Sequence, residues 1–266
     1  MIKYCTKLFI YTRLFYITSI ALIYNTNFIK KYDLSPEIIT SPYMDTNNNT
    51  NTTITNLFSN SSSEKTVLNF LSHFSSYDAI QFIHIAKDSY TADSNFAFFP
   101  FLPLLINKLS SILKLLIKPL HFKYEITFLL ISGFILSNAF CYINAILLYS
   151  LIYTISNDKL KSKICALLFL INPGSMFYMS IYAENLCMTM SILFIYFLIN
   201  SADGIMTNFI PLCVLLIGLI ATRSNSLFMC SYFVIPCVSI LFTGKPKISD
   251  MFDINSFKYN FNQFFT

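Results

Sequence analysis

The residues best suited to chemistry in this sequence are an aspartate, a glutamate and an arginine that lie far apart along the chain. Asp78 lies at the start of YDAIQFIHIAKDSY (77–90), while Glu184 and Arg223 separate long uncharged runs. An ionised aspartate can accept a proton from an attacking hydroxyl group, and a guanidinium that faces a polar cavity is a preferred binder of phosphate. These residue types suit the transfer of a group from a phosphate-bearing donor to a hydroxyl acceptor.

Each of the three residues also has a structural interpretation. Residues 77–90 have the spacing of a helix, and Asp78 in its first turn fits a helix cap as well as a general base. Glu184 follows a Pro-Gly pair and fits a solvated hairpin turn, and Arg223 could extend to lipid headgroups. The residue types alone leave both interpretations open.

The elements that carry these residues are predicted to be membrane helices. Among 266 residues, 55% are apolar and 12% are charged, against about 25% charged in an average soluble domain. The mean hydropathy is +0.58. A helix needs about 20 apolar residues to cross the hydrocarbon layer. Long apolar runs predict an all-α polytopic membrane protein, a single membrane domain over 1–266, with spanning helices at 8–24, 126–155, 164–182, 185–202, 204–222 and 224–243.

One long polar loop, 25–96, follows the first helix. Its middle, 46–65, is low-complexity sequence that is expected to be flexible, and 77–90 is its expected catalytic-loop helix. Three Asn-x-Ser/Thr sequons in the middle agree with a luminal loop, although such a composition also produces sequons by chance. The first helix is expected to stay uncleaved, because Arg13 interrupts it and no small-residue cleavage motif follows.

Segment 97–120, which follows this loop, is amphipathic. Its lysines and a serine recur at helical spacing, and such a helix more often lies in the membrane interface than crosses the bilayer. The predicted apolar face consists of Leu105, Leu109, Ile112, Leu113 and Leu116.

The position of this amphipathic segment decides the topology. If it does not cross, the lysines around Lys161 become cytoplasmic, as the positive-inside rule prefers, and Asp78, Glu184 and Arg223 share the luminal face. If it crosses, the later assignments invert. The loop charges favour the first arrangement, in which a polar tail, 244–266, follows the last helix.

Several site classes lack sequence support. The three histidines have no ligand-like spacing, six of the seven cysteines fall inside apolar runs without a CxxC pair, and no glycine-rich nucleotide motif is present. The net charge of +5 comes from lysines at the ends of apolar runs, where orientation signals belong. We therefore expect no metal site, no nucleotide site and no nucleic-acid partner.

Four sequence blocks resemble the PIG-V family of mannosyltransferases. YDAIQFIHIAKDSY is similar to the family's WDA segment followed by F-x-x-IA-x-x-x-Y, and NFAFFPFLPL (95–104) to NFAFFP-x-x-PL. NPGSMFYMSIYAENL (172–186) resembles P-x-x-x-F-x-x-x-x-YSE-x-L, and ATRSNSL (221–227) resembles an RSNG segment. The aromatic NFAFFP string is the most specific of these matches.

The resemblance implies a fold, a location and a reaction. It implies a GT-C-like bundle of six or seven spanning helices in the endoplasmic reticulum membrane. The reaction would transfer the second mannose of the glycosylphosphatidylinositol (GPI) precursor, in α1,6 linkage, from dolichyl-phosphate mannose. The partners would be these two lipid-linked substrates, membrane lipids and a small accessory membrane subunit, with no cofactor beyond the donor.

The resemblance also assigns candidate site residues. The family's luminal-loop aspartate corresponds to Asp78, the expected catalytic base. On physical grounds Arg223, aided by Lys87, would stabilise the departing phosphate. The remaining substrate-binding candidates, which would shape the acceptor pocket or support its fold, are Tyr77, Tyr90, Asn95, Glu184 and Asn225.

The sequence departs from the family pattern at three positions and in length. Tyr77 replaces the usual Trp, Ala183 a Ser and Ser226 a Gly, and an aromatic ring at Tyr77 keeps sugar stacking available. Family members usually continue with further helices, so either an incomplete gene or a reduced enzyme fits this chain. The alternative functions are another dolichyl-phosphate-sugar transferase, a non-catalytic membrane subunit or a transporter.

Overall fold

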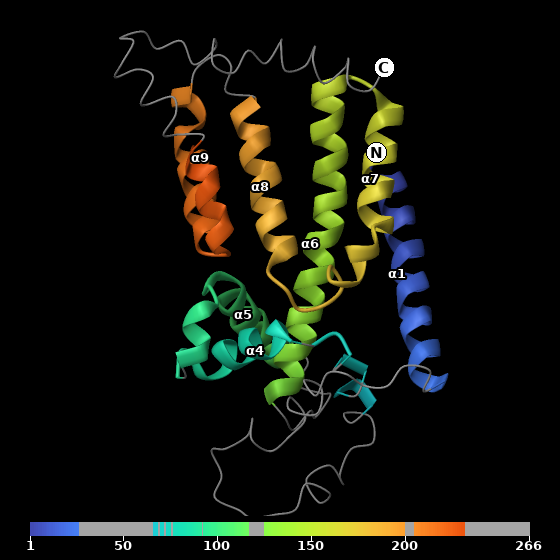
Figure 1. Cartoon of the computed structure of the whole chain (residues 1–266), viewed down its shortest axis with the longest axis vertical. Coiled ribbons are helices and arrows are strands. Elements are labelled where there is room, and N and C mark those ends of the chain that lie inside the picture. The colour runs from blue at the N-terminus through green and yellow to red at the C-terminus, as the bar shows by residue number, and fades with distance from the viewer. Residues whose placement is uncertain are drawn as a thin grey trace, which may run out of the picture. The chain divides into compact units, whose positions relative to one another are not determined.

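The computed structural model describes residues 1–26, 66–116 apart from 69, 72, 76 and 92, 125–199, and 205–231. Within these ranges all regular elements are helices (Figure 1), which confirms the all-α prediction. They are α1 (Ile2–Thr26), α4 (Asp78–Asp88), η3 (Asp93–Ala97), α5 (Phe101–Leu116), α6 (Glu125–Ser156), α7 (Lys159–Ile171), η5 (Pro173–Met176), α8 (Glu184–Ile199), α9 (Ile205–Ile220) and η6 (Ser224–Cys230). The predicted flexible tract, 46–65, and the polar tail, 244–266, lie outside the described residues.

The chain forms two compact units. The first contains the described residues of Met1–Thr12, Tyr142–Asn172 and Glu184–Thr266, and the second those of Arg13–Cys141 and Pro173–Ala183. Helices α1 and α6 contribute residues to both units.

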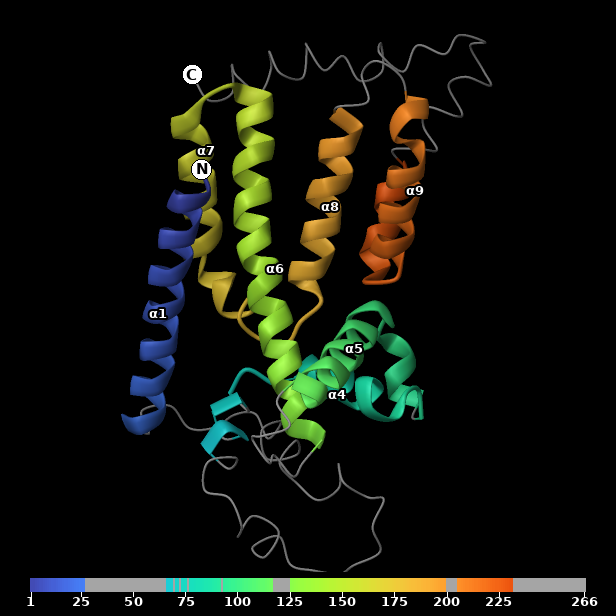
Figure 2. The same ribbon diagram turned by 180° about the vertical axis from the view of Figure 1, so that it is seen from behind.

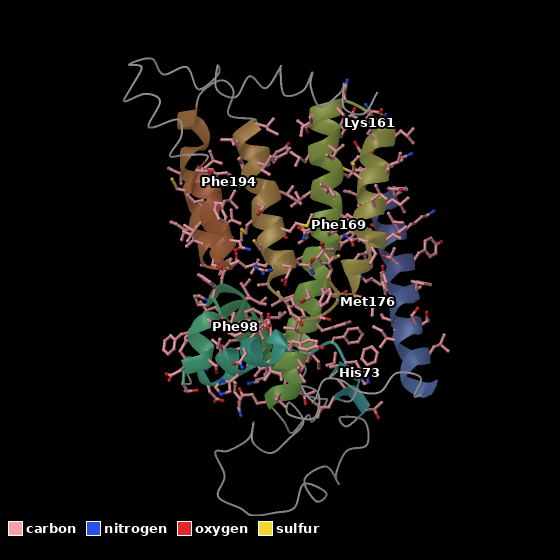
Figure 3. All side chains as sticks on the ribbon, in the orientation of Figure 1. His73, Phe98, Lys161, Phe169, Met176 and Phe194 are labelled. Atoms are coloured by element: carbon pink, nitrogen blue, oxygen red, sulfur yellow. The ribbon has the colours of Figure 1, made fainter. Side chains whose placement is uncertain are left out.

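Apolar packing holds the helices of the first unit together. Helices α8 and α9 lie side by side in both views (Figures 1 and 2) and bury Phe194, Leu212 and Leu219 between them. Phe194, labelled in Figure 3, is fully buried. Between α6 and α8, Leu151 and Ile192 are buried in a second cluster. Because these helices are apolar on several faces, each can pack against more than one neighbour.

A buried polar contact also joins α6 to α8. The side-chain amide of Asn144 donates a hydrogen bond of 2.9 Å to the carbonyl of Asn185, and Thr189 Oγ1 lies 2.7 Å from Asn144 Oδ1. All three residues are buried. Buried polar groups are costly unless they are hydrogen-bonded, so this contact favours one register between the two helices.

The predicted helix over 164–182 is shorter in the structure. Helix α7 begins five residues earlier than predicted, where Asp158 Oδ1 accepts hydrogen bonds from two backbone N–H groups, and it ends at Ile171. Pro173 explains the early end, because proline disfavours helical backbone at the residue before it and cannot donate the next helical hydrogen bond. Residues 173–183 form η5 and turns instead.

Among the described helices, α6 is the one that is both long and apolar enough to cross a membrane. Its 32 residues extend over about 48 Å. Helix α8 and the Ile210–Ile220 part of α9 are apolar but shorter. For the predicted helix at 224–243 the structure gives the 3-10 helix η6, and residues beyond 231 lie outside the described part. The count of six or seven spans stays a prediction.

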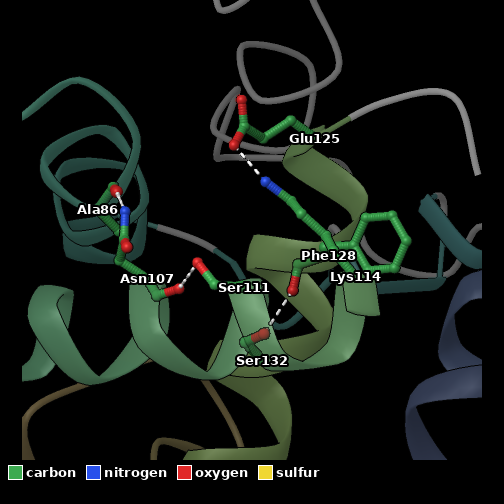
Figure 4. A network of polar contacts seen from close by, with 7 residues as sticks. All are labelled: Ala86, Asn107, Ser111, Lys114, Glu125, Phe128 and Ser132. Atoms are coloured by element: carbon green, nitrogen blue, oxygen red, sulfur yellow. Dashed lines mark hydrogen bonds and ion pairs between the residues drawn. The ribbon is translucent and has the colours of Figure 1, made fainter. Parts of the chain in front are cut away.

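The second unit contains α4, η3, α5 and the start of α6. Helix α4 buries Phe82, Ile83 and Ala86, and Asn107 of α5 donates a hydrogen bond of 2.6 Å to the carbonyl of Ala86 (Figure 4). In the same network Lys114 of α5 forms an ion pair with Glu125, the first residue of α6. Polar contacts from the middle and from the last turn of α5 thus join it to α4 and to α6.

The predicted amphipathic helix differs from the structure in its start and in its buried face. Helix α5 begins at Phe101 rather than at 97, because η3 and a short turn precede it. The face buried against protein carries Leu102 and Ile106, whereas Ile112 and Leu116 of the predicted apolar face are 51% and 72% exposed. A helical pattern identifies an apolar face but does not specify which neighbour covers it.

Candidate functional site

Asp78 is the first residue of α4, and its side chain is exposed. The capping position belongs to Tyr77, whose side chain forms no capping hydrogen bond. Within the described part of the chain, no hydrogen bond or ion pair involves the Asp78 carboxylate. The side chain therefore does not cap this helix. Its carboxylate lies at the helix N-terminus without a partner among the described residues, and the helix dipole there favours a negative charge.

Tyr77 adopts a backbone conformation that is unusual for an aromatic residue. Its φ of 53° and ψ of −114° lie in a region that glycine adopts far more readily, because a Cβ atom crowds the backbone there. Its side chain is 62% exposed. An exposed aromatic ring thus stands directly beside the free carboxylate, a combination suited to stacking on a sugar ring.

Asn95 and Tyr90 hold the corner that follows α4. Asn95 is 1% exposed, and its amide donates to His84 Nδ1 at 3.1 Å and to the carbonyl of Ser89 at 3.5 Å. The Tyr90 hydroxyl donates to the carbonyl of Phe98 at 2.8 Å. Burial raises the pKa of Tyr90, so the hydroxyl keeps its proton and remains a donor. Both residues support the fold of the loop that follows the C-terminal end of α4.

Lys87 lies at the opposite end of α4 from Asp78. Nine helical steps of 1.5 Å separate the two residues along the axis, about 14 Å in all. Lys87 is half-buried in the last turn of the helix. The structure therefore does not place it beside the candidate base, although both belong to the same helix.

Glu184 and Arg223 are brought together as an ion pair in the first unit. Glu184 is the first residue of α8, Arg223 follows the end of α9, and Glu184 Oε1 contacts Arg223 Nη1. The two side chains are 35% and 38% exposed. Such a pair meets the need of ionisable groups near apolar helices for a partner. The structure thus adds a direct contact between the two side chains to the solvated-turn and headgroup interpretations.

The pair leaves binding capacity on both partners. A guanidinium carries five N–H donors, and Glu184 engages Nη1 of Arg223. Arginine next to a carboxylate can still bind phosphate oxygens with its other donors. Asn225, in η6, is exposed two residues after Arg223.

The candidate residues are divided between the two units. Tyr77, Asp78, Lys87, Tyr90 and Asn95 belong to the second unit. The three later candidates, Glu184, Arg223 and Asn225, belong to the first.

Arg13 is a charged residue whose role was not recognised from the sequence. It lies within α1 with 6% of its surface exposed, and its guanidinium donates to the carbonyl of Ser175 at 3.4 Å and contacts Cys141 Sγ. It thereby joins α1, η5 and α6 within the second unit. The sequence does contain a signal for this role, because a lone arginine inside an apolar helix usually faces protein partners.

The comparisons with known proteins agree with the four sequence blocks. Residues 5–251 match the family described as mannosyltransferase (PIG-V). Over 122 residues the chain is 32% identical to GPI mannosyltransferase 2 of Drosophila pseudoobscura pseudoobscura, a region that covers 46% of this chain and 26% of that protein. The matched region thus spans about a quarter of the relative's own length. No solved structure matches the chain.

Proposed function

Because this chain belongs to the PIG-V mannosyltransferase family, we propose that it adds the second mannose to the GPI precursor in α1,6 linkage. The donor is dolichyl-phosphate mannose, and the acceptor is the GPI glycolipid that carries one mannose. The match to a protein named GPI mannosyltransferase 2 supports this choice of pathway. The enzyme works in the endoplasmic reticulum membrane as a multi-pass protein, with Asp78 on the luminal side.

The observation that carries the proposal is the exposed carboxylate of Asp78 at the start of α4, which has no partner among the residues that the structure describes. Asp78 accepts the proton of the acceptor's 6-hydroxyl group as that oxygen attacks the anomeric carbon of mannose. The bond between this carbon and the phosphate oxygen breaks, and its electron pair leaves with dolichyl phosphate. The configuration at the anomeric carbon inverts. Tyr77 supplies an aromatic surface for one of the two sugars.

Arg223 stabilises the negative charge that develops on the departing phosphate. The ion pair with Glu184 supports this role, because it restrains the guanidinium while leaving other N–H donors available. Lys87 lies at the far end of α4 from Asp78, and we give it no part in holding the phosphate. We assign Asn225, which is exposed two residues after Arg223, a contact with the same lipid-linked donor.

The test uses cells that lack the second mannosyltransferase of the GPI pathway. Wild-type chain is expected to restore GPI-anchored proteins at the cell surface, whereas Asp78→Asn is expected to reach the same protein level and restore none. Asp88→Asn is the matched control, because Asp88 is an exposed aspartate on the same helix. It should restore surface proteins as wild type does.

The lipid that accumulates in these cells identifies the step. Cells with Asp78→Asn should accumulate a precursor with one mannose. Full restoration by Asp78→Asn would show that Asp78 is not the base. A precursor arrested at any other stage, corrected by the wild-type chain, would assign the protein to a different acceptor.

A further inference from the structure

Glu184 uses only one of its two carboxylate oxygens. Oε1 contacts Arg223, while Oε2 is buried and has no hydrogen-bond donor among the residues that the structure describes. A buried polar atom without a partner is unfavourable. A donor group supplied by a ligand would remove that penalty.

Two hydroxyl groups close to Arg223 in the sequence are engaged elsewhere. Thr222 Oγ1 donates to the carbonyl of Leu219 at 2.6 Å, and Ser226 Oγ lies 3.4 Å from Cys187 Sγ. Both residues are buried. Both side chains therefore serve the packing at the end of α9. Neither donates to Glu184 Oε2, which can still accept a hydrogen bond.

A ligand can reach the carboxylate beside the ion pair. About a third of each side chain is exposed, and the last torsion of a glutamate is broad and two-fold. A partial rotation about this torsion turns the buried Oε2 toward the exposed side, so that one oxygen holds Arg223 and the other faces the ligand. Any group bound to that second oxygen lies within one carboxylate's width of the guanidinium.

We propose that Glu184 binds the 2-hydroxyl group of the donor's mannosyl unit while Arg223 holds its phosphate. This inference rests on the proposed function for the identity of the donor. In a sugar phosphate the anomeric carbon carries the phosphate, and carbon 2 is its neighbour in the ring. The 2-hydroxyl is thus the sugar hydroxyl closest to the phosphate along the ring, which matches an acceptor oxygen beside a phosphate-binding arginine.

This contact would give the enzyme a basis for sugar selection. Mannose and glucose differ only in the orientation of the hydroxyl group at carbon 2. A site that hydrogen-bonds a substrate hydroxyl discriminates strongly against an analogue that lacks or misplaces it, because its polar group is then left unpaired. Glu184 is therefore a specificity-determining residue for mannose, in addition to positioning Arg223.

The test compares two donors with the purified full chain in lipid vesicles. The donors are dolichyl-phosphate mannose and its 2-deoxy analogue, and the quantity measured is the ratio of their kcat/KM values. In Glu184→Ala this ratio should fall by about 10- to 100-fold relative to wild type, the range for a hydrogen bond to a charged group. Glu184→Gln, which keeps the side-chain size, should lower the ratio by a smaller factor.

Glu125→Ala is the matched control, because Glu125 is also the first residue of a helix and also forms an ion pair. It should leave the ratio unchanged. An unchanged ratio in both Glu184 variants, with activity still measurable, would overturn the inference alone. A ratio that responds to deoxy analogues of the acceptor instead would assign the hydroxyl to the acceptor and overturn the donor assignment. No mannose transfer by wild type would overturn the proposed function, and this inference with it.

Discussion

At the residue scale, the candidate base and the aromatic ring beside it are both exposed at the start of α4. Asp78 is exposed at the start of α4, and Tyr77 holds a positive φ of 53° while its side chain is 62% exposed. Residues held in sparsely populated backbone regions cost about 1–3 kcal/mol and cluster at functional sites. The cost at Tyr77 is consistent with a ring that is kept for ligand binding.

Tyr77 therefore offers a substitution with opposite effects on stability and activity. Tyr77→Gly should raise the free energy of unfolding by about 1 kcal/mol, because glycine adopts positive φ without strain, yet it should raise the KM for the sugar substrates. Tyr77→Trp keeps an aromatic ring and should retain wild-type KM. Thermal unfolding and steady-state kinetics measure the two effects. A Tyr77→Gly variant with unchanged KM would argue against sugar stacking.

At the element scale, the segment between α7 and α8 packs closely on α6. The N–H of Ile181 donates to the carbonyl of Phe74 at 3.0 Å, and Ile181 is 1% exposed. A Cβ atom added at Gly133 of α6 would lie 2.8–3.0 Å from three side-chain carbons of Ile181. Such distances are too short for carbon atoms, so the close approach requires glycine.

Because Gly133 and Ile181 are in contact, substitutions at these two positions should have non-additive effects on the free energy of unfolding. Gly133→Ala should lower the free energy of unfolding by about 1–3 kcal/mol, as overpacking of a buried contact does. Ile181→Ala removes the clashing carbons and by itself leaves a cavity. The double variant should therefore be more stable than the sum of the two single effects, by at least about 0.5 kcal/mol. Strict additivity in thermal unfolding would contradict the contact.

Helix α5 has one face packed on protein and exposed apolar residues on its other side. One face packs through Leu102 and Ile106, while Leu104, Ile112 and Leu115 are each more than half exposed on its other side. Exposed apolar residues along an amphipathic helix with lysines are typical of helices that lie at a membrane surface. This arrangement agrees with the topology in which α5 does not cross.

At the scale of the whole molecule, that topology assigns the chain's charged loops to opposite sides of the membrane. The N-terminal part of α7, directly after the turn that follows α6, carries Lys159, Lys161 and Lys163, and positive charge next to short loops favours the cytoplasmic side. The α4 helix would then be luminal. Both positions lie in the part of the chain that the structure describes.

Cysteine labelling in intact membranes tests the assignment. In a variant without native cysteines, Lys159→Cys should react with an impermeant reagent from the cytosolic side. Asp88→Cys, on α4, should react only after the membrane is permeabilised. Both positions are exposed, so folding does not block the reagent. The reverse labelling pattern would contradict the predicted topology.

Much of the secondary structure could be predicted because its causes are local. The predicted helix at 126–155 corresponds to α6 within one residue at each end, and the helix over 77–90 corresponds to α4. The length of an apolar run and the helical spacing of its residues are properties of one continuous stretch of sequence, so they can be read without knowing the tertiary contacts. The helix predicted at 164–182 was wrong in extent, because the effect of Pro173 outweighed the continuing apolar run.

The amino-acid sequence by itself determined the helical class, the positions of most helices and, through four short blocks, the family. Only the tertiary structure decided that Glu184 meets Arg223, that α5 buries Leu102 and Ile106, and that Asp78 does not cap its helix. Glu184 and Arg223 lie 39 residues apart in the chain. Contacts over such separations depend on how whole helices pack against each other, which no local pattern of residues specifies.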